Sequence, residues 1–174
     1  MSRWFVFAWL LLAGCSNPQI SDVPSTEVMS FLSATQALHR QADIHENANR
    51  QGDALAALER IIALPQPRAT PEIHEVLADT HARIAETLLK QGKLDKAIDH
   101  VRKGLAHAQS PTFFRGHLLE VEGAILEAES KNLRAAGKES EADEKRKAAL
   151  ARLNEAVAIH ESVIRHQLGD AGTK

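Results

Sequence analysis

Nine histidines are the residues of this chain most suited to binding a metal ion, because neutral imidazole is a common ligand of transition metals. They are His39, His45, His74, His81, His100, His107, His117, His160 and His166. The nearest pairs along the chain (39/45, 74/81, 100/107 and 160/166) lie six or seven residues apart, and seven helical residues span about 10.5 Å. Two such imidazoles on one helix cannot both reach an ion through bonds of about 2.0 Å. We therefore expect no metal and no cofactor, while a site formed between helices stays open as an alternative.

Paired carboxylates are a second group that could do chemistry, as general acids and bases. The acidic residues of one segment, Glu120, Glu122, Glu127 and Glu129, precede a basic run at 145–147. These glutamates alternate at the spacing of a helix surface, and no glycine-rich or nucleophile loop lies near them in the sequence. We expect them to form salt bridges across a helix hairpin or to be solvated.

No catalytic motif is present, and we expect that the protein is not an enzyme. The sequence lacks the GxSxG, P-loop, GxGxxG and CxxCH patterns. Its single cysteine excludes an intramolecular disulfide and a cysteine-based zinc site. The net charge of −2, from 21 basic and 23 acidic residues, is not that of a nucleic-acid-binding protein.

The amino-terminal residues have the features of a secretory signal. Arg3 is the only charged residue before Asp22, and an apolar run of nine residues covers 4–12, which is shorter than the ~20 residues of a membrane span. The motif that follows, Leu12-Ala13-Gly14-Cys15, resembles the lipobox of bacterial lipoproteins. The resemblance implies that residues 1–14 are a signal peptide and that Cys15, which becomes the first residue, is acylated and anchored in the lipid bilayer. The alternatives are a plain cleaved signal and a coincidental apolar segment with a buried cysteine.

The residue after the lipobox bears on the location of the protein. In lipoproteins of enteric-type bacteria an aspartate at this position favours retention in the inner membrane. Ser16 stands there instead, which favours the outer membrane, with the protein facing the periplasm. Residues 15–25 contain two prolines and several small polar residues, so we expect a flexible tether.

The rest of the chain has helical apolar periodicity, and few aromatic residues, so we expect an all-α fold. Capping signals predict helices over 26–51, 53–64, 71–92, 94–109, 111–137 and 141–167. Thr70-Pro71 and Ser110-Pro111 are the expected starts of the third and fifth helices, and Asp53 the N-cap of the second. Turns at Gly52, Gly92 and Gly137 would make three antiparallel hairpins, the last elongated, followed by a disordered tail at 169–174.

The middle hairpin carries a family resemblance. The segment IAETLLKQGKLDKAIDHVRKGLAHA resembles a tetratricopeptide repeat. Its small residues Ala85, Gly92, Ala97 and Gly104 match the positions at which that family brings its two helices close together. His81 and Val101 stand where the family often has aromatic residues, and the first and third hairpins match less well. The expected domain, residues 26–168, is a short solenoid similar to these repeats, and a plain helical bundle is the alternative.

The family resemblance implies a function in protein binding. Tetratricopeptide repeats bind peptides in a groove lined by their first helices, and here the implied positions are Asp79, Arg83, Glu86 and Lys90. Their mixed charge suits a polar peptide. We therefore expect a periplasmic scaffold or adaptor lipoprotein that binds another envelope protein, with self-association through the end hairpins as a further expectation. The alternative is a periplasmic helical bundle that binds a metal or small ligand through histidines between helices.

Overall fold

Six helices make up the part of the chain that the computed structural model describes, residues 25–171, and no strand occurs there. They are α1 (Thr26–Asn47), α2 (Gln51–Ala63), α3 (Pro71–Lys90), α4 (Leu94–His107), α5 (Phe113–Ala135) and α6 (Glu139–Ala171). The predicted all-α class is confirmed. The predicted signal peptide, Cys15 and nearly all of the tether lie outside the described residues.

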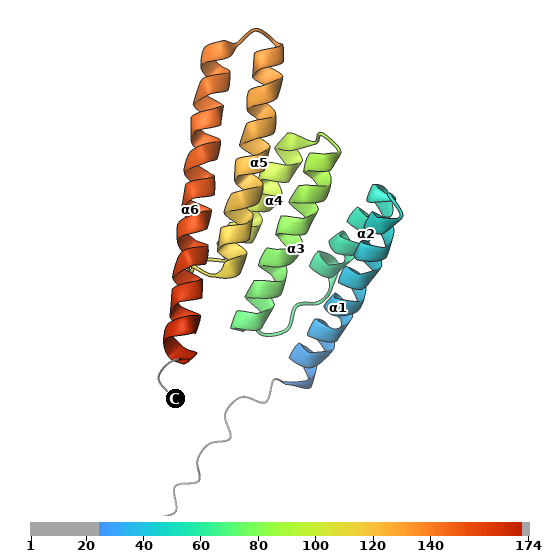
Figure 1. Ribbon diagram of the computed structural model, residues 1–174. Coiled ribbons are helices and arrows are strands. Elements are labelled where there is room, and N and C mark those ends of the chain that lie inside the picture. Colours follow the sequence, from blue (N-terminus) through green and yellow to red (C-terminus); the bar gives the residue numbers. More distant parts are fainter. Residues whose placement is uncertain (1–24, 172–174) are drawn as a thin grey trace, which may run out of the picture.

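The helices are arranged as three neighbouring pairs, α1 with α2, α3 with α4 and α5 with α6 (Figure 1). Between the pairs, α2 contacts α3 and α4 contacts α5. The odd-numbered helices also contact one another, α1 with α3 and α3 with α5. Among the described helices, no Cα atom of α2 lies within 8 Å of one of α4, and the same holds for α4 with α6 and for α1 with α6. The odd-numbered helices therefore form one continuous layer.

Small side chains let these helices approach closely. Ala85 of α3 and Ala97 of α4 have no exposed surface and lie in the largest apolar cluster, with Leu58, Ile84 and Ile125. At Gly104 of α4, an added Cβ would lie only 2.5 Å from Leu118 Cδ2 of α5. Any larger residue there would have to displace a buried side chain.

The three turns between paired helices do not use the same residue type. Gly92 and Gly137 adopt left-handed backbone conformations, with φ of 72° and 76°. The predicted turn at Gly52 is wrong, because Asn49 takes the left-handed conformation with φ of 56° and Gly52 lies inside α2. Asparagine is one of the few residues other than glycine that tolerate this region. The predicted N-cap at Asp53 is wrong for the same reason, since α2 already begins at Gln51.

Among the remaining predicted helix starts, some are confirmed by the structure and others are wrong. The start of α3 at Pro71, after Thr70, is confirmed. The predicted start at Ser110-Pro111 is wrong, because Thr112 is the N-cap of α5 and its hydroxyl accepts a hydrogen bond from the Arg115 N–H. The last helix, α6, begins at Glu139 and continues to Ala171, so residues 169–171, expected to be disordered, are helical.

The long α6 packs on α5 with one side and leaves an apolar row on another. Ala142, Ala149 and Ala156, spaced seven residues apart, are buried. The exposed apolar row consists of Leu150, Leu153, Val157, Ile164 and Leu168. None of the described helices has the combination of length and apolar character that a membrane span needs.

Candidate functional site

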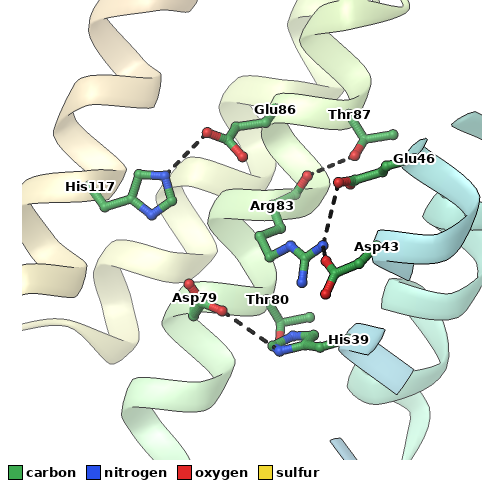
Figure 2. Close-up of polar contacts among 9 residues, drawn as sticks. All are labelled: His39, Asp43, Glu46, Asp79, Thr80, Arg83, Glu86, Thr87 and His117. Atoms are coloured by element: carbon green, nitrogen blue, oxygen red, sulfur yellow. Dashed lines mark hydrogen bonds and ion pairs between the residues drawn. The ribbon is translucent and has the colours of Figure 1, made fainter. Parts of the chain in front are cut away.

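The side of α3 that lies between α1 and α5 carries a stripe of charged and hydroxyl side chains (Figure 2). The four residues implied by the family resemblance belong to it, because positions 79, 83, 86 and 90 recur every three or four residues and so share one side of a helix. Three of them, Asp79, Arg83 and Glu86, lie within 4 Å of an oppositely charged or titratable side chain on a neighbouring helix. Lys90 is exposed at the end of α3. We call this set of contacts the polar layer.

Arg83 connects α3 to α1. Its Nη2 atom lies 2.5 Å from Asp43 Oδ1 and 3.5 Å from Glu46 Oε2, and its side chain is only 16% exposed. The Thr87 hydroxyl donates a hydrogen bond of 2.9 Å to the Arg83 carbonyl one turn earlier. A guanidinium between two carboxylates is a charge-assisted contact that fixes the separation of the two helices.

His39 of α1 makes a second contact with α3. The Thr80 hydroxyl donates to the Val76 carbonyl at 2.7 Å, so at 3.0 Å it accepts the proton of His39 Nε2. His39 Nδ1 lies 3.8 Å from Asp79 Oδ2. Burial lowers the pKa of His39 and outweighs the nearby Asp79 carboxylate, which acts in the opposite direction. His39 is therefore a neutral hydrogen-bond donor at neutral pH.

Glu86 connects α3 to α5. Its Oε1 atom lies 3.2 Å from His117 Nε2. This hydrogen bond raises the pKa of His117. Burial opposes the ionisation of Glu86, but the contact with His117 prevails and the pKa of Glu86 is below its usual value. Both shifts favour a carboxylate paired with an imidazolium.

A hollow of about 320 Å³ lies between α3 and α5, beside this pair. It is lined by Glu86, Leu89, Lys90, His117, Glu120, Val121 and Ala124. Its walls thus combine both charges with apolar surface. Of the four predicted partner-binding residues, Glu86 and Lys90 line the hollow, whereas Asp79 and Arg83 contact α1.

The carboxylates of α5 mostly pair with α6, as expected from the sequence. Glu122 Oε2 lies 3.1 Å from Arg152 Nε, and Glu129 Oε2 lies 2.6 Å from Lys145 Nζ. Glu120 Oε1 lies 3.3 Å from His160 Nε2. These ion pairs hold the last two helices together.

Four histidines form a row between α3 and α4, which the sequence analysis did not find. Nδ1 of His74 lies 3.1 Å from Nδ1 of His107, and Nδ1 of His81 lies 3.0 Å from Nδ1 of His100. The rings of His81 and His107 stack between the two pairs, with centroids 5.9 Å apart. The sequence did contain a signal for these two pairs. The midpoint of positions 74 and 107 and that of positions 81 and 100 both fall between residues 90 and 91, next to the turn, so an antiparallel hairpin places the members of each pair opposite one another. Within the described residues, no group of three or more His, Cys, Asp or Glu side chains is arranged to hold a metal ion.

Burial keeps most of this row uncharged at neutral pH. It lowers the pKa of His81 to about 4, with a further contribution from the neighbouring His100 and His107. It also lowers the pKa of His100 and of His107. Each of these three neutral imidazoles therefore carries a proton on one ring nitrogen and a lone pair on the other. That lone pair is either free or accepts a hydrogen bond.

Comparison of the chain with protein-family models, with curated proteins and with solved structures found no match.

Proposed function

We propose that this protein is a membrane-anchored periplasmic lipoprotein that acts as a scaffold or adaptor and binds another envelope protein through helices similar to tetratricopeptide repeats. The observation that carries the proposal is the continuous layer of α1, α3 and α5. The even-numbered helices do not contact one another among the described residues. A closed bundle would bring α1 or α2 against α6, whereas a short open solenoid leaves the first helices of its pairs in one layer.

We assign partner binding to the hollow between α3 and α5, which lies beside the Glu86–His117 contact of the polar layer. Asp79 and Arg83 already face groups on α1, so they position the helices. Lys90 is exposed at the rim of the hollow, and its charge lowers the pKa of Glu86. A polar segment of a partner with an acidic and an apolar side chain matches these walls.

Membrane anchoring through Cys15 is the second component of the proposal, and it depends on the motif Leu12-Ala13-Gly14-Cys15. Several acyl chains hold a protein on a bilayer far more firmly than one. In the native host, an alkyne analogue of palmitate should label the wild-type protein in the membrane fraction. The Cys15→Ser variant should be unlabelled, and label retained on that variant would refute the assignment.

Removal of the signal peptide has a simple optical test. Both tryptophans, Trp4 and Trp9, lie in the proposed signal, and the sequence contains no tyrosine. The mature protein, purified from membranes, should therefore have almost no absorbance at 280 nm. Tryptophan absorbance in the mature protein would show that residues 1–14 had been retained.

Crosslinking in intact cells tests the scaffold function. A carboxyl-terminal tag recovers the protein with its partner for mass spectrometry. We expect one dominant envelope protein, whose recovery is lost in a Lys90→Glu/Ala124→Arg variant that reverses the rim charge and fills the hollow. The matched control is Lys103→Glu on α4, whose partner Asp99 lies on the same helix. Equal recovery by both variants, or no partner at all, would refute the proposal.

A further inference from the structure

The four-histidine row between α3 and α4 is not used by the scaffold function. Its two pairs have nearly equal Nδ1–Nδ1 distances, 3.1 Å for His74 and His107 and 3.0 Å for His81 and His100. Their surroundings differ. His74 is exposed and His107 half-buried, whereas His81 is only 5% exposed.

The outer pair borders a hollow of about 270 Å³ at the ends of α3 and α4. His74, Glu75, His107, Gln109 and Ser110 are among its lining residues. An ion held by the two imidazoles would therefore have space for water, or for the groups of another molecule, at its remaining positions. Beside the inner pair, the positive charge of Lys103 would oppose a bound cation, and it adds to burial in lowering the pKa of both His81 and His100.

The distance within the outer pair also indicates the kind of ion. With metal–nitrogen bonds of about 2.0–2.1 Å, two nitrogens 3.1 Å apart subtend an angle of about 95–102° at the metal. That range lies between the right angle of neighbouring ligands in square-planar or octahedral geometry and the tetrahedral angle typical of structural zinc sites, and it is narrower than the tetrahedral angle. Imidazole ligands in tetragonal geometry are typical of Cu²⁺ and Ni²⁺.

We propose that His74 and His107 form an open, two-imidazole site for a divalent transition-metal ion of the Cu²⁺ or Ni²⁺ type. The site lies at the end of the α3–α4 pair and takes its remaining ligands from solvent or from a second molecule. It does not depend on the scaffold function. The competing explanation is an ordinary hydrogen bond, in which one imidazole donates its Nδ1–H to the other, since 3.1 Å also fits that contact.

The test uses the full mature chain with a carboxyl-terminal tag that contains no histidine. Cu²⁺ is titrated into the protein by calorimetry, and the visible spectrum and the electron paramagnetic resonance spectrum report nitrogen ligands. We expect one high-affinity equivalent of Cu²⁺. Because loss of outer-shell partners alone typically costs about 10–100-fold in metal affinity, replacing a direct ligand in His74→Gln or His107→Gln should weaken binding at least tenfold.

Two further variants locate the site. His45→Gln removes an imidazole of α1 outside the row, and His100→Gln removes one from the inner pair, so neither should change the affinity for Cu²⁺. Equal affinity in all four variants, or an equal loss in all four, would overturn the proposal, and a loss confined to His100→Gln would move the site to the inner pair and refute it as stated.

Thermal unfolding gives a second measurement and guards against misfolded variants. An ion that binds only the folded state raises the unfolding temperature. Cu²⁺ should therefore raise that temperature for the wild-type protein but not for His74→Gln, whose exposed position makes it the variant least able to disturb the fold. The same increase in both proteins would refute the site.

Discussion

The close approach of α4 and α5 at Gly104 gives a sharp stability prediction. In a Gly104→Ala variant, the new methyl group would lie 2.5 Å from Cδ2 and 3.0 Å from Cδ1 of Leu118, and 3.2 Å from Cβ of His81. Leu118 has no exposed surface and His81 is 5% exposed, so the new methyl group would displace buried side chains. Adding a methyl group to such a well-packed core typically costs about 1–3 kcal/mol.

Alanine also favours the helical state, so Gly104→Ala needs a matched control. Relative to glycine, alanine gains up to ~1 kcal/mol in a helix interior. Gly52 lies within α2, and a Cβ added there would meet no heavy atom within 4 Å apart from its chain neighbours and the nearby backbone of its own helix. Gly52→Ala therefore makes the same change from glycine to alanine within a helix, in its first turn, without the collision. The free energy of unfolding of Gly104→Ala should be lower than that of Gly52→Ala by about 1–3 kcal/mol.

Urea denaturation, followed by circular dichroism at 222 nm, measures this difference. The midpoints should separate while the slope with urea stays the same in both variants, since the surface exposed on unfolding hardly changes. Shortening Leu118 to valine should recover part of the loss in Gly104→Ala, which a double-mutant cycle would register as coupling. If Gly104→Ala were as stable as Gly52→Ala, the close approach of α4 and α5 at this point would be wrong.

Three other predictions concern acid, an ion pair and a turn. Between pH 7 and pH 5 the unfolding free energy should fall by about 2 kcal/mol through His81, whose pKa is about 4 in the fold against ~6.5 when unfolded. The unfolded chain binds more protons in this window, so the stability is present above pH 6.5 and lost towards pH 4. Urea titrations at both pH values should show that the unfolding free energy of His81→Gln depends less on pH than that of the wild-type protein. Arg83→Met should lower the unfolding free energy by about 1–2 kcal/mol, while Lys131→Met, at an exposed pair with Glu127, should change it little. Gly92→Ala should cost about 1 kcal/mol because of its positive φ, whereas Asn49→Gly should cost nothing, and thermal melts of both variants decide. An unchanged melting temperature in Arg83→Met or Gly92→Ala would contradict the corresponding contact or strain.

The helices themselves were predictable because apolar periodicity is a local property of the sequence. The turns at Gly92 and Gly137 were predicted correctly, since glycine there is the residue that accepts a positive φ. The first turn was mispredicted because both Asn49 and Gly52 can take that conformation. Only the chain on either side decides between them, since Gln51 and Gly52 extend α2 by about half a turn at its start. The start of α5 was mispredicted because Ser110 and Thr112 can both cap a helix.

The candidate sites depend on pairings that no local pattern contains. The spacing of 79, 83, 86 and 90 placed those residues on one side of α3, but not their partners. Asp43 lies 40 residues before Arg83, and His117 lies 31 residues after Glu86. The histidine row was missed because each helix was considered alone. The relative alignment of α3 and α4 determines whether two imidazoles meet.

The order in which helices contact one another also determines how the protein opens. Each described helix contacts only those one or two places along the chain, so the structure behaves as a nearly one-dimensional array in which ends open first. The central helix α3 alone contacts four others, α1, α2, α4 and α5. Its amide hydrogens can reach solvent only after both ends have separated, so α3 should be the slowest segment to exchange with deuterium. Because α3 also carries Glu86, Lys90 and His74, a ligand at either proposed site would contact the helix that has the most neighbouring helices.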